Sequence, residues 1–145
     1  MTKADRLRVT QPVPAKRQKV FQGFSDPKLA RRWGPDRCRV VSFEADMRVG
    51  GAFRQVMKCD GDLHTAYGVY KKIIPDKKVV FTHQWEEEHP VETLVTFEFR
   101  DTKAGTDIVL TQTGFRDASA AKGHEEGWAS ALARFAKMFA SKRGR

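Results

Sequence analysis

A helical repeat of apolar residues near the C-terminal end is the clearest pattern in this chain. Residues 119–141 predict one long amphipathic helix. Its apolar stripe consists of Trp128, Ala131, Leu132, Phe135, Met138 and Phe139. Such a stripe has to be buried against another element, and the strand-rich sequence before it is the partner that the chain offers.

Alternating apolar and polar positions before this helix predict six strands joined by short turns. The segments are 39–44, 52–58, 64–74, 79–85, 93–100 and 106–113. Turn residues such as Asp60-Gly61 separate them. Gly68 lies inside one segment, where an interior glycine marks a bend or a close approach. Because short turns join antiparallel neighbours, these segments predict an antiparallel sheet.

The first forty residues predict one further strand and two short helices. Residues 6–10 alternate like a strand, which we expect to stop at Pro12. A helix is predicted after Pro14 and a second one from Pro27, ended by Gly34. The chain therefore predicts an α+β fold, with a strongly curved sheet of six or seven strands and the long helix on its concave face.

Length and composition place the chain among ordinary globular proteins. Its 145 residues, 40% of them hydrophobic, predict a single domain over residues 1–145. No apolar run approaches the roughly 18 residues that span a bilayer. The first residues, MTKADRLRVTQ, lack the apolar stretch of a signal peptide. We therefore predict a cytoplasmic protein.

Positive charge is concentrated at the N-terminal end. The formal net charge is +9, and residues 1–39 hold eleven Lys or Arg against three acidic residues. A basic surface of this kind can attract nucleic acid, anionic lipid or an acidic ligand. The alternative is a solvated face that keeps the protein in solution.

The two cysteines, Cys38 and Cys59, are too few for a disulfide scaffold and lack the spacing of metal ligands. In a reducing cytoplasm we expect both to be free thiols. If residues 47–51 turn a hairpin, however, the cysteines fall near opposite positions on adjacent strands. A register change of one residue would place them on different faces, so a redox pair stays open as the alternative.

Several short motifs occur in an order that resembles one protein family. They are Phe24-Ser25-Asp26-Pro27, Trp33-Gly34-Pro35, Arg48-Val49-Gly50-Gly51-Ala52-Phe53-Arg54, Gly68-Val69-Tyr70, Thr106 with Leu110, and His124 with Gly127-Trp128 and Leu132. Together they resemble the activator of Hsp90 ATPase homologue 1-like (AHSA1-like) branch of the START/Bet v 1-like superfamily. The resemblance extends from Arg6 to Phe139.

The resemblance implies a helix-grip fold, in which a seven-stranded antiparallel sheet grips the C-terminal helix around an internal cavity. Members of the wider superfamily bind apolar small molecules, and some are cyclases, aromatases or hydrolases. This sequence departs from the family in the strand 79–85, where His83 stands in place of a usual Trp. If His83 faces the cavity, a polar and titratable group replaces part of an apolar wall.

Strand alternation and the helix stripe predict which side chains face the space between sheet and helix. These predicted ligand-binding residues are Phe53, Gln55, Met57, Tyr70, Phe81, His83, Trp85, Phe97, Phe99, Leu110, Gln112, Trp128, Leu132 and Phe135. Apolar groups with a few polar ones among them are typical of small-molecule pockets. The same side chains could instead fill a core at native density, and the pattern does not choose between the two.

His83 carries the most chemistry in this set. An unperturbed histidine pKa near 6.5 lets small changes of environment switch the charge. With Tyr70, Gln55 and Gln112 it could hold a carbonyl or carboxylate, or act as a general acid or base. The alternative is a hydrogen-bonded core histidine. We interpret His124, one turn before Trp128, as a structural hydrogen-bond donor to the sheet or the short helices.

Other motifs do not form a site. The chain lacks the G-x-S-x-G pattern of a nucleophile elbow. Successive residues of Glu86-Glu87-Glu88-His89 do not converge on one ion, so they predict a solvated loop. Gly50-Gly51 lacks the strand-to-helix context of a phosphate loop and predicts a hairpin turn. We therefore predict no catalytic residue, no metal and no cofactor.

The sequence favours a non-catalytic protein that binds an apolar or aromatic small molecule between sheet and helix. One alternative is a cyclase- or hydrolase-like enzyme that uses His83 and Tyr70. Another is an interaction module with a basic N-terminal face for a protein or nucleic acid. We expect no membrane partner, and nucleic acid is disfavoured because no strand interleaves aromatic and basic residues. The oligomeric state stays open, a homodimer included.

Overall fold

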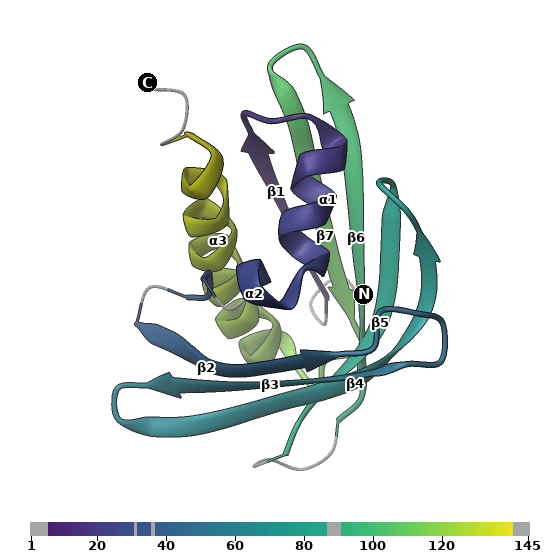
Figure 1. The fold of residues 1–145 in the computed structure, drawn as a ribbon. Helices are drawn as coiled ribbons and strands as arrows, with labels where there is room; N and C mark the ends of the chain where they lie inside the picture. Colours follow the sequence, from purple (N-terminus) through teal and green to yellow (C-terminus); the bar gives the residue numbers. More distant parts are fainter. Residues whose placement is uncertain (1–5, 31, 36, 87–90, 141–145) are drawn as a thin grey trace.

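A seven-stranded antiparallel sheet curves around one long helix (Figure 1). The computed structural model describes residues 6–30, 32–35, 37–86 and 91–140. The strands are β1 (Arg6–Val13), β2 (Cys38–Ala45), β3 (Ala52–Cys59), β4 (Asp62–Ile74), β5 (Lys78–Trp85), β6 (Thr93–Thr102) and β7 (Gly105–Thr113), and the helices are α1 (Arg17–Ser25), α2 (Pro27–Ala30) and α3 (Ala118–Ala140). The predicted α+β helix-grip fold is confirmed.

Strand order follows from the short turns. The order is β1-β7-β6-β5-β4-β3-β2, with every pair antiparallel, so strands β2 to β7 pair with their neighbours in the chain. The connection through α1 and α2 carries the chain from β1 across to β2. These two strands therefore form the opposite edges of the sheet.

The first strand is longer than the sequence predicts. It runs through Pro12, which pairs in register with Asp107 of β7, and ends at Val13. As an edge strand, β1 has a ladder partner on one side only, and there a proline without an N–H is tolerated. The expectation that the strand stops at Pro12 is therefore wrong.

Gly68 marks the close approach of β4 and β5 that its position in the strand predicts. A Cβ at Gly68 would collide with the carbonyl oxygen of Thr82. Beside it, the amide of Val69 donates a hydrogen bond of 2.9 Å to Oγ1 of Thr82, in place of an ordinary ladder bond to a carbonyl. Glycine is thus the residue that lets the two strands come this close.

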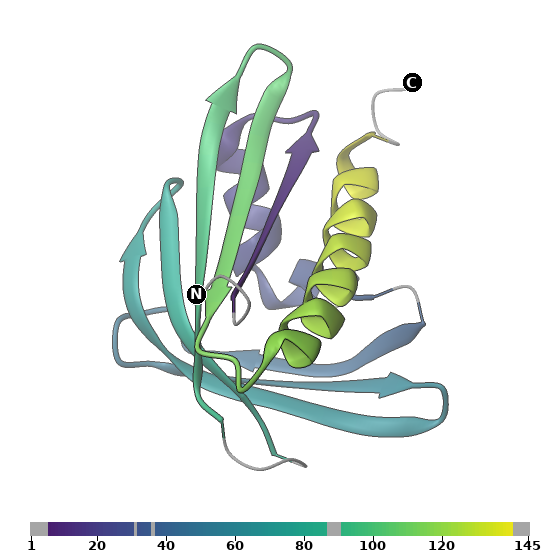
Figure 2. The same ribbon diagram turned by 180° about the vertical axis from the view of Figure 1, so that it is seen from behind.

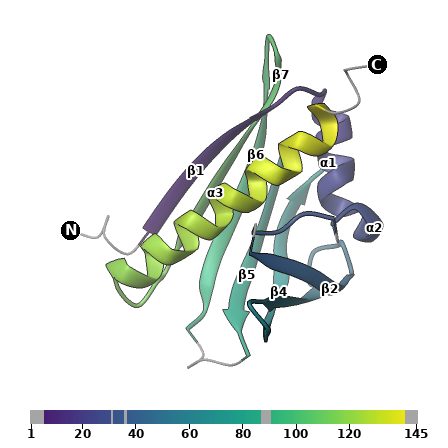
Figure 3. The same ribbon diagram turned by 90° about the vertical axis from the view of Figure 1, so that its left-hand side faces the viewer.

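The long helix lies alongside β1 (Figures 2 and 3). Its C-terminal half is buried through Leu132, Phe135 and Ala136, and Phe135 packs against Gly23 of α1. This end of the helix completes a dense core with β1, β6, β7 and α1. The N-terminal half of the same helix meets a different surface.

Candidate functional site

A cavity of about 880 Å³ lies between the N-terminal half of α3 and the concave face of β2 to β5. One wall is the helix face from Ser119 to Ala131, and the segment between α2 and β2 forms part of the rim. The volume falls within the range of known small-molecule sites.

Glycine at position 68 shapes the floor of this cavity. Phe53 of β3 pairs with Gly68 of β4, and His83 lies on the next strand, β5. Because no side chain stands on β4 at this position, the rings of Phe53 and His83 approach to 6.3 Å between centroids across the intervening strand. The ring of Phe53 therefore lies over Gly68, where a Cβ would stand 2.8 Å from Cε2 of that ring.

Aromatic rings form most of the floor and walls. Phe53 contacts Phe81 edge-on at 5.2 Å and Tyr70 at 5.7 Å. The rings of Trp85 and Trp128 lie 5.2 Å and 6.3 Å from that of His83. These rings present flat apolar surfaces to the cavity and fix one another in edge-to-face contacts.

A buried hydrogen-bond chain holds Trp128 against the sheet. Nε1 of Trp128 donates to Oε1 of Gln112 at 2.7 Å, and Nε2 of Gln112 donates to Oγ1 of Thr93 at 2.8 Å. The Thr93 hydroxyl in turn donates to the backbone carbonyl of His83 at 2.8 Å. Every polar group of Gln112 is thereby used in orienting the helix and β5, and none points into the cavity.

His124 joins the helix to the end of β5. Nε1 of Trp85 donates to Nε2 of His124 at 2.9 Å, and Nδ1 of His124 lies 2.9 Å from the carbonyl oxygen of Ala120. These two contacts assign the neutral tautomer with the proton on Nδ1. His124 therefore accepts a hydrogen bond from the sheet, whereas the sequence suggested that it would donate one.

Two polar side chains of the cavity are held in their neutral forms. Burial lowers the pKa of His83 from 6.5 to about 3, and His124, in its charged form, acts in the same direction. Burial raises the pKa of Tyr70 above its usual value of 10. Within the described part of the chain, neither the Tyr70 hydroxyl nor the ring nitrogens of His83 have a hydrogen-bond partner, and these atoms stay accessible from the cavity.

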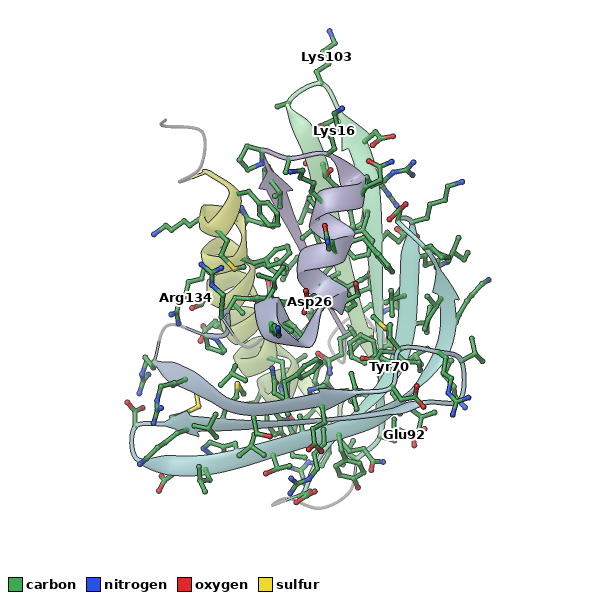
Figure 4. The ribbon with its side chains drawn as sticks, viewed as in Figure 1. Lys16, Asp26, Tyr70, Glu92, Lys103 and Arg134 are labelled. Atoms are coloured by element: carbon green, nitrogen blue, oxygen red, sulfur yellow. A yellow bond between two sulfur atoms is a disulfide. The ribbon has the colours of Figure 1, made fainter. Side chains whose placement is uncertain are left out.

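The rim of the cavity is charged and crosslinked. Nη2 of Arg37 lies 2.6 Å from Oδ2 of Asp60, and both side chains are exposed. Arg134 of α3 (Figure 4) donates to the carbonyl oxygens of Gly34 and Pro35 at 3.2 and 3.0 Å. The helix thus holds the segment that leads into β2.

The cysteines are bonded to each other, so the expectation of free thiols is wrong. Cys38 begins β2, Cys59 ends β3, and the two residues pair in register with their sulfurs joined. A register shift between Val40 and Ser42 brings this about, since the pairing near the hairpin would otherwise set Cys38 opposite Asp60. Both cysteines line the cavity.

The structure brings most of the predicted ligand-binding residues together around one cavity. Nine of them line it: Phe53, Gln55, Met57, Tyr70, Phe81, His83, Trp85, Phe97 and Trp128. All nine come from β3 to β6 and the N-terminal half of α3. Their role in binding stays a prediction.

The other five predicted residues lie in the dense core and do not reach the cavity. They are Phe99, Leu110, Gln112, Leu132 and Phe135. Phe99 is covered by α1, where Phe21 and Phe24 lie 5.6 and 5.7 Å from its ring. Strand parity and the helix stripe give the face of a residue but not which part of that face another element covers, so they do not separate these five residues from the lining of the cavity.

Several lining residues were missed. His64 lines the cavity on the same strand face as Tyr70, and the parity of β4 could have identified it. Trp33, Gly34 and Pro35 lie at the predicted end of the second short helix, and only the tertiary structure brings them to the rim. The small helix residues Gly123 and Gly127 carry a signal that was not used, because a stripe of small residues leaves space beside a helix.

Other predicted features fall elsewhere. The acidic loop predicted at residues 86–89 lies, apart from Glu86, outside the described residues. Basic side chains of the N-terminal region are distributed over both edges of the sheet, and Arg17 and Arg37 pair with Asp101 and Asp60. In the described ranges, no group of three or more His, Cys, Asp or Glu could hold a metal ion.

None of the described helices is both long enough and apolar enough to cross a bilayer.

A curved sheet that grips a long helix around an open cavity defines the class of helix-grip domains. The model of the activator of Hsp90 ATPase homologue 1-like protein family matches residues 14–140, and the chain belongs to this family. A comparison with curated proteins gives no significant match.

Solved structures show the same fold. A protein from Chromobacterium violaceum is 25% identical with a TM-score of 0.83, covering 93% of this chain and 96% of that one. The AHSA1 protein from Silicibacter pomeroyi is also 25% identical with a TM-score of 0.83, covering 94% and 99%. A protein from Nitrosomonas europaea, 18% identical with a TM-score of 0.82 and full coverage of both chains, is similar in fold.

Proposed function

We propose that this protein binds an uncharged, largely apolar or aromatic small molecule in the cavity between α3 and strands β2 to β5, without transforming it. The cavity itself is the observation that carries the proposal, because its volume and aromatic lining suit a molecule with several rings. Members of the family commonly bind hydrophobic ligands, which supports the same function.

Hydrogen-bonding groups inside the cavity define the ligand further. Tyr70, His83 and Gln55 all line it, and His83 and Tyr70 are buried. A ligand that leaves buried polar groups unpaired loses affinity. We therefore expect the ligand to carry at least one hydroxyl or carbonyl group placed to meet His83 or Tyr70.

The distribution of charge favours an uncharged ligand. The charged side chains of the lining are all exposed at the rim: Arg37, Asp60, Arg116, Asp117 and Glu126. Deep in the cavity His83 is neutral, because burial lowers its pKa to about 3. A carboxylate bound there would lose its water without gaining a cation, which is costly.

The shifted pKa values also favour binding over catalysis by His83 and Tyr70. A general acid or base works best with a pKa near the operating pH. Burial moves the pKa of His83 well below that range and the pKa of Tyr70 further above it. Both side chains are suited to hydrogen bonding in their neutral forms.

A matched series of fluorescent pyrenes tests this proposal, because the three compounds differ only in their polar group. We expect hydroxypyrene to bind about five- to tenfold more tightly than pyrene, the gain from one hydrogen bond. Pyrene carboxylate should bind more weakly than both, since its charge is not compensated. Fluorescence titration of the purified protein gives the three dissociation constants.

Two variants with matched controls locate the binding. His83→Phe should remove the preference for hydroxypyrene over pyrene, whereas His64→Phe, another ring of the same lining, should retain it. Gly123→Leu extends a side chain into the cavity and should weaken all three compounds, whereas Ala133→Leu on the exposed side of α3 should not. Failure of every pyrene to bind, or binding that ignores Gly123→Leu, would contradict the proposal.

The cytoplasmic location and the assignment of residues 1–145 to one domain stay predictions from the sequence.

A further inference from the structure

The disulfide lies where the cavity opens. Cys38 and Cys59 both line the cavity, half-buried, and their chain neighbours Arg37 and Asp60 form the exposed ion pair beside them. The bond therefore joins the first residue of β2 to the last residue of β3 at the rim, away from the dense core.

The strand end that it holds has few other attachments. β2 is an edge strand that pairs with β3 alone, and its register shifts between Val40 and Ser42. Beyond this bulge, only the pairs Cys38–Cys59, Arg39–Lys58 and Val40–Met57 continue the ladder. Because edge strands fray from their ends, the disulfide is the strongest link that holds this end in place.

The preceding segment forms part of the rim, and besides the ring of Trp33, which packs 4.7 Å from that of Phe135, it is held by few hydrogen bonds. Arg134 binds the carbonyl oxygens of Gly34 and Pro35, and the amide of Cys38 donates to Pro35 at 2.9 Å. The indole N–H of Trp33 is buried, and no hydrogen-bond partner for it is found in the described part of the chain. A buried donor of this kind favours an opened state in which water reaches it.

We propose that Cys38 and Cys59 form a redox site that controls access to the cavity: the disulfide keeps residues 33–35 and 37–40 closed over the rim, and its reduction lets them open. This inference rests on the proposed function, since it concerns access to the same cavity. The co-reactant is a dithiol. One of its thiolates attacks a sulfur of the pair, the S–S bond breaks, and the other protein sulfur leaves as a thiolate that takes up a proton. The second sulfur of the dithiol then attacks the mixed disulfide as a thiolate and releases the remaining protein thiol, while the dithiol becomes a disulfide.

Opening should change the rate of ligand exchange more than the affinity. The disulfide lies at the rim, and the hydrogen-bonding side chains His83 and Tyr70 lie on β5 and β4, away from the crosslinked end of β2. Removing the crosslink lowers the cost of opening, which acts on association and dissociation alike. The dissociation constant should therefore change by no more than a few-fold.

Stopped-flow fluorescence with hydroxypyrene tests the proposal on the full chain. We expect release from the dithiol-reduced protein to be at least about tenfold faster than from the oxidised protein. The double variant Cys38→Ser/Cys59→Ser should release the probe at the fast rate with or without the dithiol, which controls for other effects of the reductant. Equal release rates from oxidised and reduced protein would overturn the redox control and leave the proposed function intact.

Amide hydrogen exchange tests the same proposal without a ligand. Reduction should speed exchange in residues 33–35 and 37–40 by at least about tenfold, with residues 94–113 of β6 and β7 unchanged as the internal control. Unchanged exchange in residues 33–35 and 37–40 would overturn the proposal whatever the probe does. If hydroxypyrene binds to neither redox form, the proposed function fails and the control of access fails with it.

Discussion

The two halves of α3 face the same sheet and meet it differently. The C-terminal half carries Leu132, Phe135 and Phe139, which pack against β1 and α1 without a cavity. The N-terminal half faces the cavity with small residues, among them Gly123 and Gly127. One helix therefore has a filled end and an open end.

Side-chain size along the helix explains this difference. The large residues of the filled end set the distance between the helix and the sheet. At the open end the space between helix and sheet stays empty, because the helix carries small residues there. A Cβ at Gly123, for example, would meet nothing within 4 Å. Each glycine in a helix interior lowers stability by roughly 0.5–1 kcal/mol relative to alanine. The glycines of the open end therefore leave space for the cavity at a cost in stability.

The largest difference in the free energy of unfolding should come from replacing one phenylalanine at the filled end of α3 and one that lines the cavity. Phe135→Ala at the filled end should lower the free energy of unfolding by about 3–5 kcal/mol, because a sealed cavity adds to the lost burial. Phe81→Ala should cost only about 2 kcal/mol, since Phe81 already borders open space. Urea denaturation of both variants measures this. Equal losses of unfolding free energy in the two variants would contradict the division of α3 into a filled end and an open end.

The hydrogen-bond chain that holds Trp128 against the sheet should give the next largest effect. Gln112→Leu leaves the indole N–H of Trp128 without its acceptor and removes the hydrogen bond that Thr93 Oγ1 accepts, while the Thr93 hydroxyl still donates to the carbonyl oxygen of His83. We expect a loss of about 1–3 kcal/mol in the free energy of unfolding, the cost of unpaired buried polar groups. Denaturant titration checks the stability, and a loss below the error of the measurement would show that water replaces Gln112.

Acid should destabilise the open end through His83. The unfolded chain binds a proton at this residue below about pH 6.5, whereas the folded protein excludes it until near pH 3. Stability should therefore fall as the pH falls, and this residue alone should contribute a loss of about 2 kcal/mol between pH 7 and pH 5. Denaturation of wild type and His83→Gln at both pH values isolates the effect. If both proteins lose stability equally, His83 is protonated as readily in the folded chain as in the unfolded one.

Removing one glycine of the open end should give the smallest effect, with the opposite sign. Gly123→Ala should raise the free energy of unfolding by about 0.5–1 kcal/mol, because alanine favours the helix and its methyl group meets open space. Thermal unfolding measures the gain. Ala133→Gly, on the exposed side of the same helix, should lose a similar amount, and a destabilised Gly123→Ala would mean that the space is occupied.

Prediction from sequence succeeded where the pattern was local. Strand segments, turns and the long helix lie within a few residues of their predicted positions, because alternation and helical spacing depend on near neighbours. Gly68 was expected to allow a close approach, and it does so against Thr82. For the candidate site, parity found the floor of the cavity but extended it to Phe99, Leu110 and Gln112, which other elements cover.

Sequence by itself determined the fold class, the faces of the strands and the amphipathic stripe of α3. Tertiary structure alone decided which part of that stripe is filled and which part borders a cavity, because this depends on the distance that distant residues impose. It also decided the state of the cysteines. The bulge between Val40 and Ser42 moves Cys38 by one position onto Cys59, and a one-residue shift of register depends on packing across the whole sheet, which local spacing does not encode.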